Sequence, residues 1–126
     1  MKTFFRIVIM CSIIIFVMVG MCSASSSRGY VPVSLYWTGS DIGSHTSQTC
    51  SPPAVSTYYF QENSHSGSFT YLSVYINHVK IGNLYPAAMV NNGYPVSYNV
   101  YDGSPLIEMY MGHGTGAASF SGQVNY

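Results

Sequence analysis

The chain has 126 residues, of which only 6% are charged, and its four basic and four acidic side chains cancel to a formal net charge of zero. A chain of this length forms one domain at most. With so few Lys and Arg residues, it has no basic surface for nucleic acid or for an anionic membrane. Its twelve Tyr, six Phe and one Trp exclude a disordered chain, because such chains are poor in aromatic residues.

The first residues have the pattern of a signal peptide. Lys2 and Arg6 precede an apolar run from Ile7 to Val19, and Cys22-Ser23-Ala24 follows with small residues at the cleavage positions. The run is shorter than the roughly 20 residues that span a bilayer, which disfavours the alternative of a retained anchor. We therefore expect residues 1–24 to be removed, leaving residues 25–126 as a single domain with no membrane span. Such a domain is secreted, extracellular or displayed at the cell surface, and passes through the periplasm if the source is bacterial.

Cys50 is the only cysteine outside this leader, since Cys11 and Cys22 lie within it. In an oxidising compartment, a lone thiol either pairs with another chain or is sheltered in the core. The surrounding residues, Thr46–Pro53, include two prolines and several hydroxyl residues, which predicts a loop. This composition favours exposure and makes Cys50 the candidate for an intermolecular disulfide.

Beyond the leader, short alternating runs predict β-strands. Residues 25–29 form a flexible lead-in, and Tyr30–Thr38 is the first strand because every second residue in it is apolar. The apolar residues that share its core face are Val31, Val33, Leu35 and Trp37. Gly39–Pro53 is predicted to be a long polar loop, and Val55–Gln61 the second strand.

A β-hairpin is predicted around Asn77-His78. The flanking runs, Phe69–Ile76 and Val79–Asn83, alternate in phase if these two residues form a type I′ turn. A slip of one residue would scramble both faces of the hairpin. The pairs expected to face each other on its core side are Ile76 with Val79 and Val74 with Ile81.

The later turns complete the pattern. Asn92-Gly93 and Asp102-Gly103 predict two further hairpins, and Gly112–Gly116 predicts a wide loop. The last strand, Ala118–Tyr126, is predicted to place Phe120, Val124 and Tyr126 on one face and Ser119, Ser121, Gln123 and Asn125 on the other. About seven short antiparallel strands indicate an all-β fold, namely an immunoglobulin-like β-sandwich. A small β-barrel is the alternative.

The sequence contains no recognisable motif for catalysis, metal binding or nucleotide binding. No helix follows the glycine-rich run that could hold a phosphate, and a Gly-x-Ser-x-Gly elbow is absent. The carboxylates form no acid–base pair that spacing alone reveals. The histidines beyond the leader stand at spacings that match no metal-ligand pattern, and they are His45, His65, His78 and His113. We therefore expect no enzyme, no metal and no cofactor.

The tyrosines are the strongest candidates for binding, because each offers a flat apolar ring with a polar tip. Four of them fall opposite the predicted core faces and could form an exposed stripe for a protein or carbohydrate ligand: Tyr58, Tyr71, Tyr75 and Tyr101. The alternative is that these rings fill the core or guard a face of the sheet.

Two segments resemble the subunits of bacterial chaperone–usher fimbriae. The ending from Ala117 to Tyr126 resembles their last strand, which alternates apolar residues and carries a Tyr near the terminus. The opening Val31–Gly39, followed by Cys50, resembles the strand–Gly–Cys start of such pilins. This chain departs from the family by its lack of a paired second Cys and by its shorter length. The resemblance implies an incomplete sandwich that a neighbour's strand completes.

Three functional hypotheses follow. The first is a secreted or surface-displayed β-sandwich that acts by binding or self-assembly, such as a fimbrial subunit or a small adhesin. The second is a soluble secreted effector that binds a carbohydrate or another ligand as a monomer. The third is a small secreted enzyme or toxin.

Overall fold

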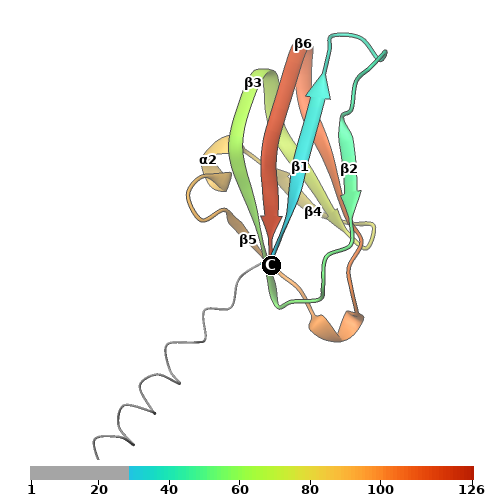
Figure 1. Ribbon diagram of the computed structural model, residues 1–126, viewed down its shortest axis with the longest axis vertical. Helices are drawn as coiled ribbons and strands as arrows, with labels where there is room; N and C mark the ends of the chain where they lie inside the picture. Colours follow the sequence, from blue (N-terminus) through green and yellow to red (C-terminus); the bar gives the residue numbers. More distant parts are fainter. Residues whose placement is uncertain (1–28) are drawn as a thin grey trace, which may run out of the picture.

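The computed structural model describes residues 29–126, and these form one antiparallel sheet of six strands (Figure 1). The strands are β1 (Tyr30–Trp37), β2 (Ser47–Cys50), β3 (Thr57–Ile76), β4 (Val79–Leu84), β5 (Tyr94–Ser97) and β6 (Ile107–Asn125). One helical turn, α2 (Pro86–Met89), and a 3-10 turn, Val100–Asp102, connect them. The prediction of an all-β antiparallel fold is confirmed. The predicted signal peptide and its cleavage site lie outside the described residues.

Two long strands form the centre of the sheet. β3 has 20 residues and β6 has 19, and they pair from Tyr59 opposite Asn125 to Ile76 opposite Ile107. One end of this ribbon pairs with β1 and β5, and the other end pairs with β2 and β4. We call these ends the β1/β5 half and the β2/β4 half. Each half forms one layer of the molecule, and β3 and β6 run through both layers.

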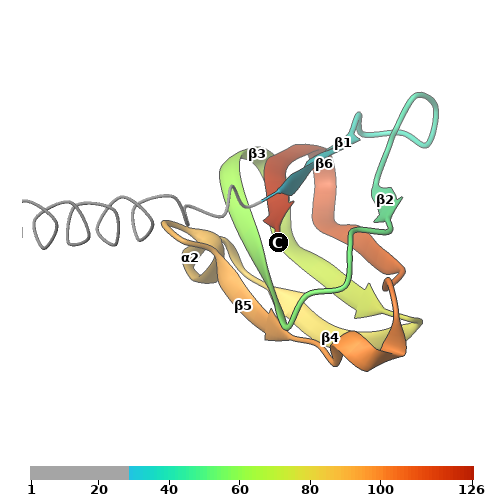
Figure 2. The same ribbon diagram turned by 60° about the horizontal axis from the view of Figure 1, so that its bottom comes forward.

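The ribbon bends between its halves, where the register of β3 on β6 shifts. Shifts occur between Glu62 and Ser64 and again on both sides of Phe69. Such bulges increase the local twist and bend a strand. Gly67 adopts a φ of 65°, and a Cβ atom there would collide with the carbonyl oxygen of Ala117. Figure 2 shows β3 and β6 curving over, so that the two halves of the sheet face each other.

The hydrophobic core fills the space between the two halves. Both halves contribute alternate residues, because successive side chains of a strand point to opposite faces. At the bend, the rings of Phe69 and Phe120 stack with their centroids 5.2 Å apart. The buried apolar residues are Val33, Leu35, Tyr58, Phe60, Phe69, Leu72, Val74, Ile76, Leu84, Met89, Val96, Ile107, Met109, Met111, Ala118, Phe120 and Val124.

Two sequence predictions of separate strands are corrected by this ribbon. Val55–Gln61 and Phe69–Ile76 were expected to be different strands, but residues 57–61 and 69–76 both belong to β3. Gly112–Gly116, expected to be a loop, lies inside β6. Glycine residues let a paired strand bend without ending it. A prediction from local glycine content therefore contains more turns than the structure does. The sequence predicted about seven strands of a sandwich, and the structure has six strands in one sheet.

The hairpin at Asn77-His78 is confirmed, with φ angles of 51° and 66° for the two turn residues. Ile76 pairs with Val79 as expected, but a register shift then places Val74 opposite Gly82 instead of Ile81. The bulge turns the start of β4 toward solvent. Val79 is 65% exposed and Ile81 is 42% exposed, although both were expected on the core side.

The other two predicted hairpins are wrong. Pro86 opens a helical turn where the arm before Asn92-Gly93 was expected, because proline suits the first position of a helix. Residues 100–102 form a 3-10 turn in which Asn99 Oδ1 accepts a hydrogen bond from the Tyr101 N–H. β5 pairs with the start of β3, and this pairing buries Val96 opposite Tyr58.

The segment predicted to be a loop around Cys50 contains a strand. Residues 47–50 pair with residues 107–110 of β6, and Cys50 ends this strand, half-buried against the core. Burial raises the pKa of the Cys50 thiol. Local composition did not reveal this strand because its pairing partner is far away in the sequence.

The outer edge of β1 is covered by a side chain. Gln48 Nε2 donates to the carbonyl oxygen of Pro32 at 2.8 Å, and the Ser34 N–H donates to Gln48 Oε1 at 3.1 Å. The side-chain amide thus replaces the peptide group of a neighbouring strand. Further along, the backbones of Tyr36 and His45 exchange two hydrogen bonds of 2.8 Å.

The remaining edges carry other features that oppose pairing with another chain. β4 contains Lys80 and faces the bulge in β3, while β5 has only four residues and includes Pro95. Among residues 29–126, no helix has the length and apolar character needed to cross a membrane.

Candidate functional site

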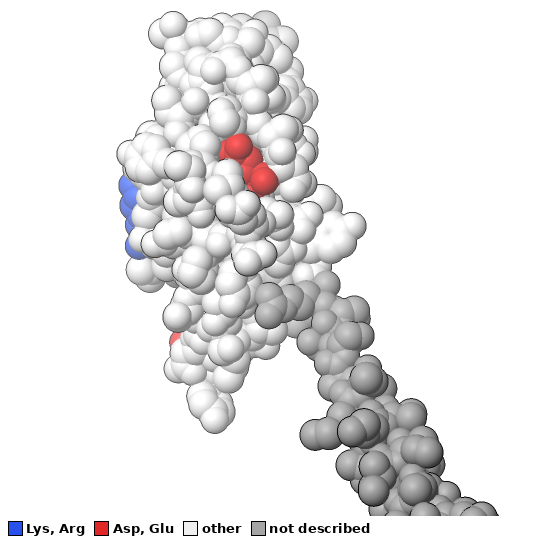
Figure 3. Space-filling view, turned by 90° about the vertical axis from the view of Figure 1, so that its left-hand side faces the viewer, with Lys and Arg blue, Asp and Glu red and all other residues white. Residues whose placement is uncertain are grey.

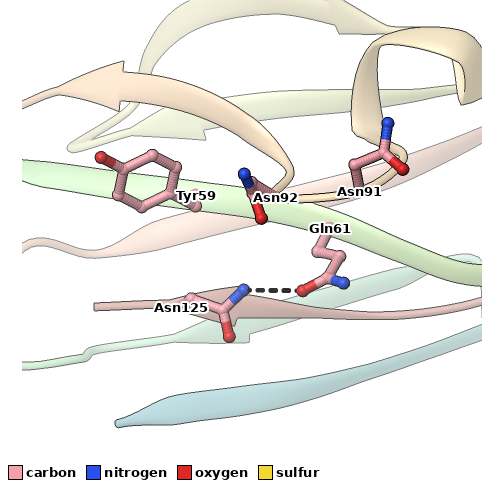
Figure 4. Close-up of a pocket in the computed structure, with 5 residues that line it drawn as sticks. All are labelled: Tyr59, Gln61, Asn91, Asn92 and Asn125. Carbon is pink, nitrogen blue, oxygen red and sulfur yellow. Dashed lines mark hydrogen bonds between the residues drawn. The ribbon is translucent and has the colours of Figure 1, made fainter. Parts of the chain in front are cut away.

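A cavity of about 490 Å³ opens on the outer face of the β1/β5 half. Figure 4 shows its lining side chains, which come from β3, from β6 and from the loop before β5. They are Tyr59, Gln61, Asn91, Asn92 and Asn125. Four of the five are side-chain amides and the fifth is a tyrosine.

Strand pairing brings three of these residues together. Tyr59 and Gln61 are two residues apart in β3, so both point away from the core. Asn125 of β6 lies directly opposite Tyr59 and therefore shares its face. Asn91 and Asn92 form a wall of the cavity, and they can approach β3 because Gly93 follows them. Gly93 has a φ of 83°, and a Cβ atom there would lie 2.9 Å from the carbonyl oxygen of Phe60.

The amides on the floor of the cavity hold one another in place. Gln61 Oε1 accepts hydrogen bonds from Asn125 Nδ2 at 3.0 Å and from Gln123 Nε2 at 3.3 Å. Gln123 Nε2 also donates to Asn125 Oδ1 at 2.7 Å. This network joins residues up to 64 positions apart in the sequence. It fixes the orientation of Gln61 and Asn125 before any ligand arrives, which lowers the entropy cost of binding.

The chemistry of the cavity is neutral and rich in hydrogen-bonding groups. Each amide can both donate and accept, and the tyrosine ring adds a flat apolar surface. None of the five lining residues is Lys, Arg, Asp or Glu. Figure 3 shows that charged side chains occupy only a few small areas of the face that it presents. The cavity therefore suits an uncharged ligand that carries several hydroxyl groups.

The four tyrosines predicted from the sequence do not form one stripe. Tyr58 is fully buried, and its hydroxyl donates to the carbonyl oxygen of Pro53 at 2.7 Å, so its predicted exposure is wrong. Burial raises the pKa of Tyr58. Tyr71 and Tyr75 lie half-buried on the outer face of the β2/β4 half, and Tyr101 is 93% exposed in the 3-10 turn.

Sequence reasoning selected the wrong tyrosine of an adjacent pair. Tyr58, Tyr59 and Phe60 are three aromatic residues in a row, so alternation of polarity cannot tell which of them face outward. The alternate amides Gln123 and Asn125 were placed on the outer face of the last strand. Only the pairing of β6 with β3 reveals that they meet Tyr59 and Gln61.

Two pairs of ionisable side chains lie outside the cavity. His65 Nδ1 lies 2.6 Å from Glu62 Oε1, and His78 Nδ1 lies 2.5 Å from Glu108 Oε1. The Tyr110 hydroxyl donates to Glu108 Oε2 at 2.9 Å, and this hydrogen bond raises the pKa of Tyr110. Within the part of the chain that the structure describes, no group of three or more His, Cys, Asp or Glu residues could hold a metal ion.

The amide-lined cavity is the candidate site that the geometry of residues 29–126 offers. Comparison of the chain with protein-family models, with curated proteins and with solved structures finds no match.

Proposed function

We propose that this protein is a secreted β domain that binds a neutral carbohydrate in the cavity lined by Tyr59 and four amides. The observation that carries the proposal is the composition of this cavity. Sugar hydroxyls both donate and accept hydrogen bonds, as the amides do, and the C–H face of a sugar ring stacks on an aromatic ring. A few fixed polar groups around an apolar surface are the usual means of orienting a small ligand.

Binding without chemistry is the simplest reading of this cavity. General acid–base catalysis on a sugar needs two carboxyl groups at the bond to be cleaved. No residue of the cavity lining is acidic, and Glu62 and Glu108 are each engaged with a histidine elsewhere. The signal peptide predicted at residues 1–24 would bring such a domain into contact with glycans outside the cell. A small adhesin is one role that this activity would serve.

Assembly in the manner of a fimbrial subunit is the second candidate, supported by the resemblance of residues 117–126 to the last strand of those proteins. Strand addition needs a sheet edge with free backbone groups. Gln48 occupies the backbone groups of β1 at Pro32 and Ser34, while Pro95 lies on the edge strand β5 and Lys80 on the edge strand β4. These features favour ligand binding by a monomer over polymerisation.

Titration of the secreted protein with neutral monosaccharides tests the proposal. The probes are glucose, galactose, mannose and N-acetylglucosamine, and their binding is measured by isothermal titration calorimetry. At least one should bind, and Gln61→Ala should weaken its binding about fivefold, because a lost hydrogen bond is worth about 1 kcal/mol. Tyr59→Ala should weaken it by a similar factor through loss of the stacking surface.

Asn63→Ala and Tyr101→Ala are the matched controls, since both residues are exposed and neither lines the cavity. They should leave the affinity unchanged. If none of the four sugars binds, or if Gln61→Ala and Tyr59→Ala bind as tightly as the original protein, the proposal is wrong.

A further inference from the structure

The cavity continues into a row of side chains that crosses the whole outer face of the β1/β5 half. Pro95, Tyr59, Asn125 and Tyr30 lie directly opposite one another on four neighbouring strands. Directly paired residues share a face, so all four side chains point outward. Adjacent strands are about 4.8 Å apart, which places Tyr59 and Tyr30 roughly 10 Å apart with Asn125 between them. Tyr30 is 59% exposed.

The rows beside this one extend the same neutral chemistry. In the next row, Gln61, Gln123 and Pro32 are paired. Beyond them come two rows in which serine predominates: Ser64, Ser121 and Ser34, followed by Ser66, Ser119 and Tyr36. None of these positions holds Lys, Arg, Asp or Glu. An anionic polysaccharide would therefore find no cationic partner on this face.

A single sugar ring in the cavity would use only Tyr59 and the amides around it. The row continues past Asn125 to a second aromatic ring, the exposed Tyr30, at a separation that further units of a sugar chain can bridge. Gln61 and Gln123 hold Asn125 in place between the two rings. The arrangement is thus two stacking surfaces joined by a fixed hydrogen-bonding group.

We infer that the ligand is a neutral oligosaccharide chain that runs from the cavity across β6 to β1, with Tyr30 as its second stacking residue. This inference rests on the proposed function and adds that the site recognises a chain rather than a single sugar. A longer ligand gains contacts at Tyr30 that a monosaccharide cannot reach. Chain length should therefore set the affinity.

The test compares each monosaccharide with a trimer of the same sugar: glucose with cellotriose, galactose with galactotriose, mannose with mannotriose, and N-acetylglucosamine with its trimer. In the original protein, one trimer should bind about tenfold more tightly than its monosaccharide, as expected for one added stacking contact. Tyr30→Ala should abolish this advantage while leaving the affinity for the monosaccharide unchanged. The unchanged affinity also shows that the variant is folded.

Tyr36→Ala is the control, because Tyr36 lies on the same strand and face but three rows away. It should leave the advantage of the trimer intact. Equal affinities for monosaccharide and trimer in the original protein, or a trimer advantage that survives Tyr30→Ala, would overturn this inference alone. Failure of both monosaccharides and trimers to bind would overturn the proposed function with it.

Discussion

The two halves of the sheet present outer faces of different chemistry. On the β1/β5 half, amides and serines predominate on this face, with the half-buried Tyr59 at the cavity and the exposed Tyr30 and Tyr36 on β1. On the β2/β4 half, the tyrosines contact one another. The rings of Tyr71 and Tyr85 meet edge to face at 5.9 Å, and those of Tyr75 and Tyr110 at 5.6 Å.

We call the outer face of the β2/β4 half the tyrosine face and that of the β1/β5 half the amide face. Side chains pack against one another on the tyrosine face, whereas the amide face has a cavity. The ring of Tyr71 covers Gly112, since a Cβ atom there would lie only 2.5 Å from that ring. The polar groups of this face are also paired with each other. Ser73 Oγ donates to Asn83 Oδ1 at 2.9 Å, and Glu108 lies between His78 and Tyr110. The tyrosines on the outer face of the β2/β4 half therefore pack against one another and against the sheet.

The largest expected effect lies at the bend that separates the two faces. Gly67→Ala combines a left-handed backbone with a collision against the carbonyl oxygen of Ala117. A side chain at positive φ costs about 1–2 kcal/mol, and overpacking costs a further 1–3 kcal/mol or so. We expect the free energy of unfolding, measured in urea, to fall by about 2–5 kcal/mol.

Gly116→Ala is the control for this change, because a Cβ atom at Gly116 would meet nothing within 4 Å. It lies in the adjoining stretch of β6 and should be nearly neutral. Equal losses in the two variants would mean that the bend does not depend on Gly67.

Substitution of one tyrosine from each outer face tests whether the two faces differ in function. Tyr71→Ala should lower the free energy of unfolding by about 2 kcal/mol, because it removes a half-buried ring and uncovers Gly112. It should leave monosaccharide affinity unchanged. Tyr59→Ala should weaken binding, as argued above. If Tyr71→Ala also weakens the binding of the monosaccharide, the two faces are not functionally distinct.

A smaller effect is expected at the edge of the amide face. Gln48→Ala removes the two hydrogen bonds that cover Pro32 and Ser34, which should cost about 1 kcal/mol at this exposed position. It also frees an edge strand for pairing, so size-exclusion chromatography should show more self-association. Gln48→Glu keeps the acceptor at Oε1, so its stability should lie between that of the original protein and that of Gln48→Ala. A strictly monomeric Gln48→Ala variant would show that other features protect this edge.

The smallest effect concerns Cys50, at the end of β2. Burial raises the pKa of its thiol above the ordinary value of 9.0, so the folded protein holds this proton more tightly than the unfolded chain. The stability that results is fully present below about pH 9 and is lost as the pH rises through the raised pKa. Tyr58, whose pKa is raised from 10.0 by burial, acts in the same direction at higher pH.

Urea unfolding between about pH 8 and pH 11 should therefore show stability falling with pH. Cys50→Ala should remove the earlier part of this fall. Labelling of the thiol at neutral pH should be slow in the folded protein and fast in urea. Rapid labelling of the folded protein, together with a dimer on a non-reducing gel, would restore the idea of an intermolecular disulfide.

The sequence by itself determined only part of the local structure of this protein. A period of two in polarity located β1 and both faces of the last strand, and Asn77-His78 located a type I′ turn. Each of these features depends on residues that are neighbours in the chain. Local pattern is sufficient there, because the alternation of side chains and the φ angles of a turn are properties of short segments.

Only the tertiary structure decided where these segments pair. It joined two predicted strands into β3, gave the Cys50 segment a strand partner, and turned Tyr58 inward and Tyr59 outward. The cavity arises from the same long-range pairing, since Gln61 and Asn125 are 64 positions apart in the sequence. Which strands pair, and in which register, depends on burying the apolar faces of the whole sheet together. Short-range periodicity carries no information about that choice, so the amide face could be described only after folding.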